Sequence, residues 1–150
     1  MANIHTTPVT IIMAEDEEGH AKLTQKNLQR AGIHNPMQWC KNGKDALDFI
    51  LGRNAFEGDP HTHDVLLLLD LNMPLLDGYQ VLEKLKSDSQ TKHIPVIILT
   101  TTDDDREVRR CYEMGCNIYI TKPVNYAEFS NAIKELGLFL SVIAIPDGIT

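Results

Sequence analysis

Five polar residues stand at the carboxyl ends of apolar runs in the sequence, and their types suit binding of a metal ion or a phosphoryl group. They are Glu15, Asp16, Asp70, Thr100 and Lys122. If the runs are parallel strands of one sheet, the strand ends bring these residues to one small area. An Asp at a strand end is by itself usually a loop start or a helix cap. The joint placement of all five residues is what predicts a single chemical site.

Carboxylates gathered in one site repel one another, which predicts a bound cation. Two unit charges about 4 Å apart cost about 4 kcal/mol at an effective dielectric constant near 20. Mg²⁺ suits the site because it takes oxygen ligands and keeps waters and phosphate oxygens. Phosphoryl transfer needs positioning and charge neutralisation. We therefore predict that Asp70 is a nucleophile toward phosphorus, with the metal, the Lys122 ammonium and the Thr100 hydroxyl covering the phosphoryl oxygens.

Short β-rich apolar runs alternate with amphipathic segments along the whole chain. Strands are predicted at 8–14, 37–40, 65–70, 95–100 and 118–121. Helices are predicted at 16–31, 43–51, 78–87 and 104–114, with a last helix from Asn125 that places Phe129, Ile133, Leu136 and Leu140 on one face. Parallel strands need crossover connections, so this alternation predicts a doubly wound α/β fold with helices on both faces of the sheet.

Two helices have residues that we expect to face the core. These are Ala21, Leu23, Leu28 and Ala31 in the first helix, and Ala46, Leu47 and Ile50 in the second. The stretch 52–63 is rich in Gly, Pro, Asn and Asp, and it is predicted to be an exposed loop.

Length and composition restrict the classes of protein to consider. The 150 residues fit one domain, with a core at about 8–140 and a C-terminal extension at 141–150. Fourteen Lys and Arg against 21 Asp and Glu give a net charge of -7, which disfavours nucleic-acid binding. No apolar run approaches the roughly 20 residues that span a bilayer, and the N-terminus lacks the features of a signal peptide. We expect a cytoplasmic protein whose cysteines, Cys40, Cys111 and Cys116, are reduced and buried.

The ordered motifs resemble the receiver domain of two-component response regulators over residues 9–140. Glu15 and Asp16 resemble the acidic pair after the family's first strand, and D-L-N-M-P from Asp70 resembles its phosphoacceptor loop. Thr100 lies 100 − 70 = 30 residues after Asp70 and Lys122 lies 122 − 70 = 52 residues after it, which are usual separations in that family. The resemblance implies a flavodoxin-like sheet of order 2-1-3-4-5 and an Asp that accepts a phosphoryl group from a sensor histidine kinase.

The resemblance also implies roles for three further residues. The backbone carbonyl of Asn72 joins Glu15, Asp16 and Asp70 as a Mg²⁺ ligand. Tyr119 takes the family's aromatic switch position beside Thr100, and Pro123 follows Lys122 through a cis peptide bond. The longer loop at 52–63 and the run L-T-T-T-D-D-D are most similar to stand-alone receivers paired with phytochromes, which implies a phytochrome-type kinase as the partner.

Other functions and sites were weighed against this one. An aspartyl-phosphate hydrolase needs a second Asp two residues after the nucleophile, and Asn72 stands there. A flavin mononucleotide carrier needs a phosphate-binding loop after the first strand, and the run E-D-E-E would repel the phosphate. His61 and His63 lack a third metal ligand nearby, and the acids at 103–105 are expected to serve a helix N-terminus.

The last helix is expected to take part in an interface. If it continued beyond Gly137, Leu138, Val142 and Ile145 would give it a second apolar side. We therefore predict a homodimer or a docking surface along this helix. The alternative is that the helix ends near Gly137 and the tail folds back over the domain.

Overall fold

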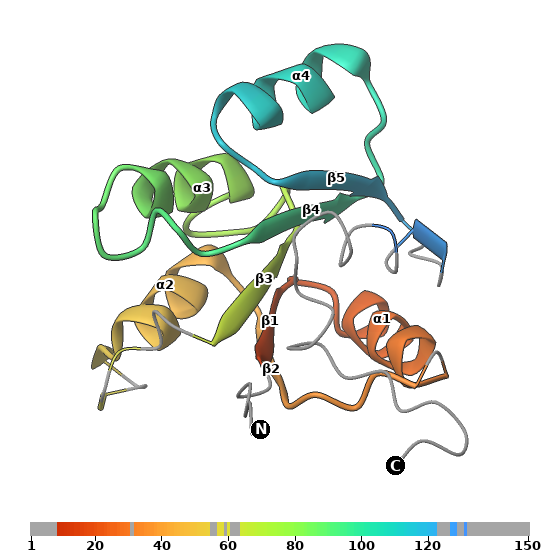
Figure 1. Ribbon diagram of the computed structural model, residues 1–150, viewed down its shortest axis with the longest axis horizontal. Helices are drawn as coiled ribbons and strands as arrows, with labels where there is room; N and C mark the ends of the chain where they lie inside the picture. The colour runs from red at the N-terminus through yellow and green to blue at the C-terminus, as the bar shows by residue number, and fades with distance from the viewer. Residues whose placement is uncertain are drawn as a thin grey trace, which may run out of the picture.

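The central sheet has five parallel strands in the order β2-β1-β3-β4-β5, as predicted (Figure 1). The computed structural model describes residues 9–30, 32–54, 57–58, 60, 64–122, 127–128 and 131. The strands are β1 (Thr10–Ala14), β2 (Met37–Cys40), β3 (Val65–Leu69), β4 (Val96–Thr100) and β5 (Ile118–Thr121). The order reverses at β1, so the carboxyl ends of β1 and β3 border the crevice in which such sheets hold their functional sites.

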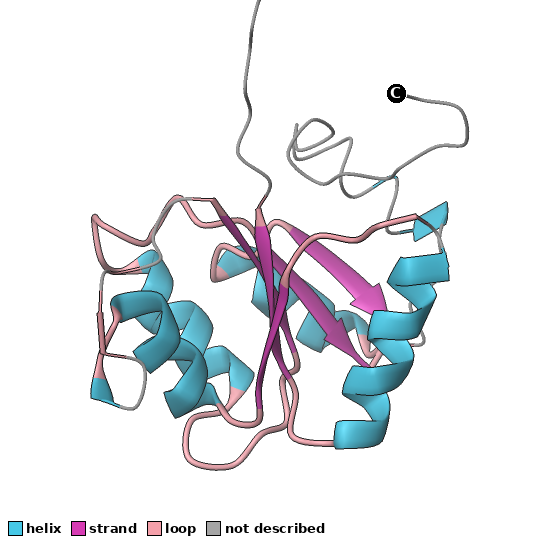
Figure 2. Ribbon diagram, turned by 90° about the horizontal axis from the view of Figure 1, so that it is seen from below, coloured by secondary structure: helices cyan, strands magenta, loops and turns pink. Residues whose placement is uncertain are grey.

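Helices cover both faces of the sheet (Figure 2). They are α1 (Glu18–Arg30), α2 (Gly43–Leu51), α3 (Gly78–Lys86) and α4 (Asp105–Glu113). Figure 1 shows α1 on one side of the sheet and α2 and α3 on the other. None of the helices in the described part of the chain is long and apolar enough to cross a membrane.

The three central strands, β1, β3 and β4, are buried on both faces, and their alternate residues enter two separate apolar cores. Ile12, Leu67 and Ile98 pack in the core beneath α2, α3 and α4. Ile11 and Leu66 pack in the other core, with Leu28 of α1. This division follows from the two-residue period of a strand, and it explains why β3 is apolar at every position.

The helices begin where short polar residues cap them. Asn42 accepts a hydrogen bond from the backbone N–H of Asp45 at 2.7 Å, and Asp77 forms a capping box with Gln80 at the start of α3. The side chain of Asp104 accepts from the backbone N–H of Arg106 at 2.8 Å. Asp104 therefore serves the N-terminus of α4, as expected for the acids before that helix.

The five predicted strands and the first four predicted helices are present, with ends that differ by at most two residues. The third strand ends at Leu69, so Asp70 follows it directly. The fourth strand begins at Val96, because Pro95 has no N–H to donate to a neighbouring strand. All three residues predicted to face the core from α2 are buried.

The predicted inward face of α1 is wrong at Leu23, which is 48% exposed. The buried residues of this helix are Ala21, Thr24 and Leu28. They are spaced by three and four residues and share one face, whereas Leu23 lies about 100° from Thr24 around the axis. The helix buries a small and a polar residue on its inner side, which hydrophobicity alone did not indicate.

Several predictions concern residues outside the described part of the chain. They are the cis peptide bond at Pro123, the loop histidines His61 and His63, the core position of Ala31, and the last helix with its proposed dimer surface.

Candidate functional site

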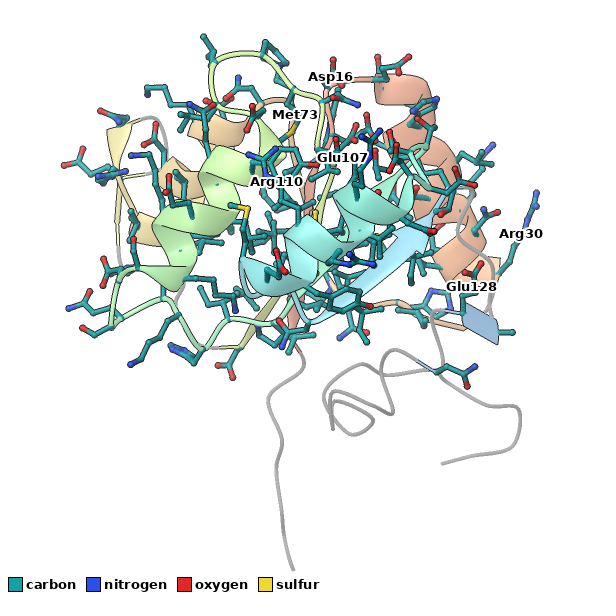
Figure 3. All side chains as sticks on the ribbon, turned by 90° about the horizontal axis from the view of Figure 1, so that it is seen from above. Asp16, Arg30, Met73, Glu107, Arg110 and Glu128 are labelled. Atoms are coloured by element: carbon teal, nitrogen blue, oxygen red, sulfur yellow. The ribbon has the colours of Figure 1, made fainter. Side chains whose placement is uncertain are left out.

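Three carboxylates meet in one acidic pocket at the carboxyl ends of β1 and β3. Ligand oxygens of Glu15, Asp16 and Asp70 lie within 4.8 Å of one another. Glu15 and Asp70 are only 6% and 7% exposed, whereas Asp16 is open to solvent. Figure 3 shows Asp16 at the same end of the molecule as Met73 of the loop that follows β3. The structure thus brings together the carboxylates that were predicted to form the site.

Strand pairing fixes the two buried acids relative to each other. Ala14 of β1 is paired with Leu69 of β3. The backbone N–H of Asp70 donates to the carbonyl of Ala14 at 3.0 Å, and that of Glu15 donates to the carbonyl of Cys40 at 3.0 Å. The backbone of each of these two acids is therefore held by a hydrogen bond at the end of the sheet, which limits the positions that its carboxylate can take.

Lys122 reaches the same pocket from the end of β5. Its ammonium group donates to Glu15 Oε1 and to Asp70 Oδ2, the latter at 3.3 Å. Its backbone N–H donates to the carbonyl of Thr100 at 2.7 Å, and its side chain is only 10% exposed. The cation partly offsets the mutual repulsion of the two buried carboxylates.

The surroundings of Glu15 disfavour the ionised form of its carboxyl. Burial raises the pKa of its carboxyl, and the neighbouring charge of Asp70 raises it further. The hydrogen bond from Lys122 opposes this shift without cancelling it. A second cation in the pocket would favour the ionised form, which is the form that can act as a metal ligand.

Thr100 lies at the end of β4 and is completely buried. Its Oγ1 has no hydrogen-bond partner among the described residues. A buried hydroxyl usually has a partner, so this hydroxyl at the carboxyl end of β4 is free to bond a group from outside the described residues. Thr101 is exposed, and of the three consecutive threonines only Thr100 is buried.

Tyr119 occupies the middle of β5, on the α4 side of the sheet. Its hydroxyl donates to the carbonyl of Thr102 at 2.5 Å, just beyond Thr100, and its backbone N–H donates to the hydroxyl of Tyr112 at 3.0 Å. Burial raises the pKa of Tyr119 to about 12, so the phenol is neutral and can donate. The ring therefore ties β5 to the segment that connects β4 to α4.

The loop after β3 is held against α3. The backbone N–H of Asn72 points to Asp70 Oδ1 at 3.4 Å, and that of Gly78 donates to the carbonyl of Leu71 at 2.9 Å. A methyl group on Gly78 would lie 2.3 Å from the carbonyl oxygen of Asp70. This close approach of two backbone segments places the first turn of α3 directly beneath the acidic pocket.

Two residues that contact the site were not predicted from the sequence. His20, in the first turn of α1, has Nδ1 3.2 Å from Lys122 Nζ. The indole N–H of Trp39 donates to the backbone carbonyl of Glu15 at 2.6 Å. The spacing of His20, four residues after Asp16, could have indicated one helical turn from the acids, whereas the contact of Trp39 depends on strand pairing and had no local signal.

The three cysteines belong to the apolar core beneath α2, α3 and α4. Cys40, Cys111 and Cys116 are buried and form no disulfide, as expected. Burial raises their pKa values to about 12, 11 and 12, so they are unreactive thiols.

The sequence model of the response regulator receiver domain matches residues 11–134. This chain belongs to that family. It is 30% identical to the response regulator Rcp1 of Synechocystis, over 97% of this chain and 99% of that protein. Rcp1 has also been solved in a Mn²⁺-bound form, which superposes with a TM-score of 0.71 at 31% identity over 93% of this chain and 99% of the other.

Two further solved receivers are similar over almost the whole chain. The bacteriophytochrome response regulator AtBRR is 31% identical with a TM-score of 0.79, covering 95% of this chain and 99% of its own. A receiver domain from Rhodospirillum rubrum is 47% identical with a TM-score of 0.70, covering 93% and 98%. The relatives of this receiver thus include phytochrome-associated response regulators, and the predicted family and fold are confirmed.

Proposed function

We propose that this receiver is a phosphorylation-controlled switch whose phosphoacceptor is Asp70. The observation that carries the proposal is the contact of the Lys122 ammonium with the buried carboxylate of Asp70 at 3.3 Å. Thr100, whose buried hydroxyl has no partner among the described residues, ends the strand next to β3 and supports it. The phosphodonor is the phosphohistidine of a sensor histidine kinase. A phytochrome-type kinase is the best candidate, because phytochrome-associated regulators are among the relatives.

The chemistry is a direct transfer between two side chains. A carboxylate oxygen of Asp70 attacks the phosphorus, the P–N bond to the kinase histidine breaks, and an acyl phosphate forms. In this proposal the Lys122 ammonium and the Thr100 hydroxyl bind phosphoryl oxygens, so charge that develops there would meet hydrogen-bond donors. A carboxylate nucleophile has no proton to lose, so its attack requires no general base.

The acidic pocket is suited to Mg²⁺, which receivers bind. The ligands would be the carboxylates of Glu15, Asp16 and Asp70 and the backbone carbonyl of Asn72. The donor set is entirely oxygen, which suits a hard divalent cation. When bound, the ion would supply positive charge that offsets the repulsion between these acids and the incoming phosphoryl group.

The output is a change in the surface near α4 and β5. A phosphoryl group adds roughly −1.5 to −2 units of charge and would draw Thr100 toward it. Tyr119 is hydrogen-bonded to Thr102, two residues further on, so this movement would disturb its hydroxyl contact. A shift from 1:99 to 99:1 in favour of the active state requires about 5.5 kcal/mol of differential stabilisation. The surface would be read by protein partners, and the predicted dimer through the last helix belongs to this proposal.

Two rival functions fit the site less well. An aspartyl-phosphate hydrolase would use an acid–base group two residues after the nucleophile, where the amide Asn72 cannot protonate a leaving group. A flavin mononucleotide carrier would place phosphate after β1, beside the carboxylates of Glu15 and Asp16, which would repel it.

The test is to incubate the protein with Mg²⁺ and phosphoramidate and to weigh it intact. We expect a single phosphoryl adduct that is stable in acid and labile in base. The control is Asp70→Asn, which should gain none. Absence of the adduct from the wild type, or its persistence in the variant, contradicts the proposal.

Trp39 provides a second measurement that does not depend on phosphorylation. It is the only tryptophan, and its indole N–H is bonded to the carbonyl of Glu15. Titration with Mg²⁺ should change its fluorescence in a saturable manner. Asp16→Asn should weaken this binding and leave the fluorescence of the metal-free protein unchanged, because Asp16 is exposed.

A further inference from the structure

His20 lies at the rim of the acidic pocket, where none of the roles described above involves it. It is the third residue of α1, and its side chain is 40% exposed. Its Nδ1 lies 3.2 Å from Lys122 Nζ, across 102 residues of sequence. A histidine on the surface of a helix can usually turn to solvent, whereas His20 contacts the buried ammonium of Lys122, so we ask what this contact does.

A hydrogen bond between these two nitrogens can have only one direction. An ammonium group has three N–H donors and no lone pair, so Nδ1 of His20 must be the acceptor. The ring is then neutral, with its proton on Nε2. Glu17 Oε2 and Glu15 Oε2 lie 3.4 and 3.9 Å from the same Nδ1, and in this tautomer they are neighbours of the ring and not ion-pair partners.

His20 completes the hydrogen bonding of the Lys122 ammonium. The group has three acceptors in the described structure, namely Glu15 Oε1, Asp70 Oδ2 and His20 Nδ1, one for each of its protons. Two of these acceptors are carboxylates and make the stronger, charge-assisted bonds. The neutral imidazole is therefore the partner that Lys122 can exchange at least cost.

We propose that His20 is a positioning residue for phosphoryl transfer. In the resting protein it holds the Lys122 ammonium between Glu15 and Asp70, and it gives up its hydrogen bond when a phosphoryl oxygen arrives as a new acceptor. The inference rests on the proposed function of Asp70, because Lys122 needs a fixed position only if a phosphoryl group is to be received.

The first experiment compares His20→Leu with His20→Asn. Asparagine places its amide oxygen close to the position of Nδ1 and can accept from Lys122, whereas leucine cannot. We expect phosphorylation by phosphoramidate at saturating Mg²⁺ to slow about fivefold in His20→Leu, the equivalent of one net hydrogen bond of about 1 kcal/mol, and to stay within about twofold of wild type in His20→Asn.

The matched control is Lys22→Leu on the same helix. Lys22 is exposed and, among the described residues, its ion pair is with Glu18, so its replacement should leave the rate unchanged. Trp39 fluorescence should report the same Mg²⁺ affinity for wild type, His20→Leu and His20→Asn, because His20 acts on Lys122 and not on the metal ligands. Equal rates in wild type and His20→Leu, or equal losses in the two His20 variants, overturn the inference.

The second experiment needs no phosphorylation and separates this inference from the proposed function. Nitrogen-15 NMR of the histidine rings should show His20 as the neutral Nε2–H tautomer. Its Nδ1 resonance should move in Lys122→Met. A protonated ring or the Nδ1–H tautomer refutes the contact even if Asp70 is phosphorylated. A wild type that shows the expected tautomer but gains no phosphoryl adduct refutes the function of Asp70.

Discussion

The close approach of Gly78 to the backbone of Asp70 allows a sharp test of how the site is positioned. A methyl group at Gly78 would lie 2.3 Å from the carbonyl oxygen of Asp70 and 2.7 Å from Cα of Leu71. Both neighbours are backbone atoms of the phosphoacceptor loop, so no side chain can rotate away to make room. Gly78→Ala must therefore displace either the loop or the first turn of α3.

The size of the displacement follows from the contact distances. Ordinary contacts to a Cβ begin at 3.4 Å, so the atoms must separate by at least 3.4 − 2.3 = 1.1 Å. Overpacking of this kind costs about 1–3 kcal/mol, and alanine recovers up to about 1 kcal/mol of helix propensity. We expect a net loss of about 1–2 kcal/mol in the free energy of unfolding. Because misplacement of a reacting group by about 1 Å can cost about a hundredfold in rate, phosphorylation should suffer more than stability.

Urea unfolding followed by circular dichroism measures the first quantity, and intact-mass kinetics with phosphoramidate measures the second. Gly19→Ala is the matched control, since no described atom lies within 4 Å of a methyl group there. Gly19 is in α1, so alanine should stabilise the protein by up to about 1 kcal/mol and leave the rate unchanged. The reasoning is refuted if Gly78→Ala is as stable as wild type and is phosphorylated at the same rate.

Three other substitutions have defined outcomes in urea unfolding. Burial raises the pKa of Glu15 in the folded protein. The free energy of unfolding of the wild type, measured relative to Glu15→Gln, should therefore be highest below the unfolded pKa of about 4.3. This difference should decrease as the pH rises through the raised folded pKa. The hydrogen bond from Lys44 lowers the pKa of Asp48, so the wild type should exceed Asp48→Asn by about 1 kcal/mol at pH 7, and this difference should vanish as the pH falls through the lowered folded pKa. The hydroxyl of Tyr79 on α3 donates to Glu107 on α4, so Tyr79→Phe should cost about 0.5–1.5 kcal/mol without changing Mg²⁺ affinity by Trp39 fluorescence.

The alternation of apolar runs and helices was enough to predict the sheet and its order of elements. It also predicted the meeting of Glu15, Asp70 and Lys122, because in a parallel sheet every strand end reaches the same edge. These contacts follow from the topology of the sheet, and the topology is encoded by a pattern that is repeated along the whole chain. A single side-chain contact is not marked by any repeated pattern, so it could not be predicted in the same way.

The failures of prediction have a common physical origin. Leu23 is apolar and was placed in the core, yet Thr24 is the buried neighbour, since the helix face is set by packing against β1 and β3. The spacing of His20 after Asp16 could have placed it near the acids, but its contact with Lys122 at the end of β5 depends on the fold and is separated from it by 102 residues. The close approach of Gly78 to the backbone of Asp70 likewise depends on how two separate backbone segments pack, which the sequence pattern does not show.

Polar groups that have their usual hydrogen-bond partners and polar groups that lack favourable partners lie in different parts of the fold. Helix starts such as those at Asn42 and Asp77 have well-formed caps. The carboxyl ends of the strands instead hold a buried acid of raised pKa, Glu15, and a buried hydroxyl without a partner, Thr100. Each of these costs stability in the resting protein, and each is relieved by something that an acyl phosphate site binds: a cation for Glu15 and a phosphoryl oxygen for Thr100. A protein selected for stability alone would have replaced both residues, so their joint presence argues that the pocket is shaped for its bound state.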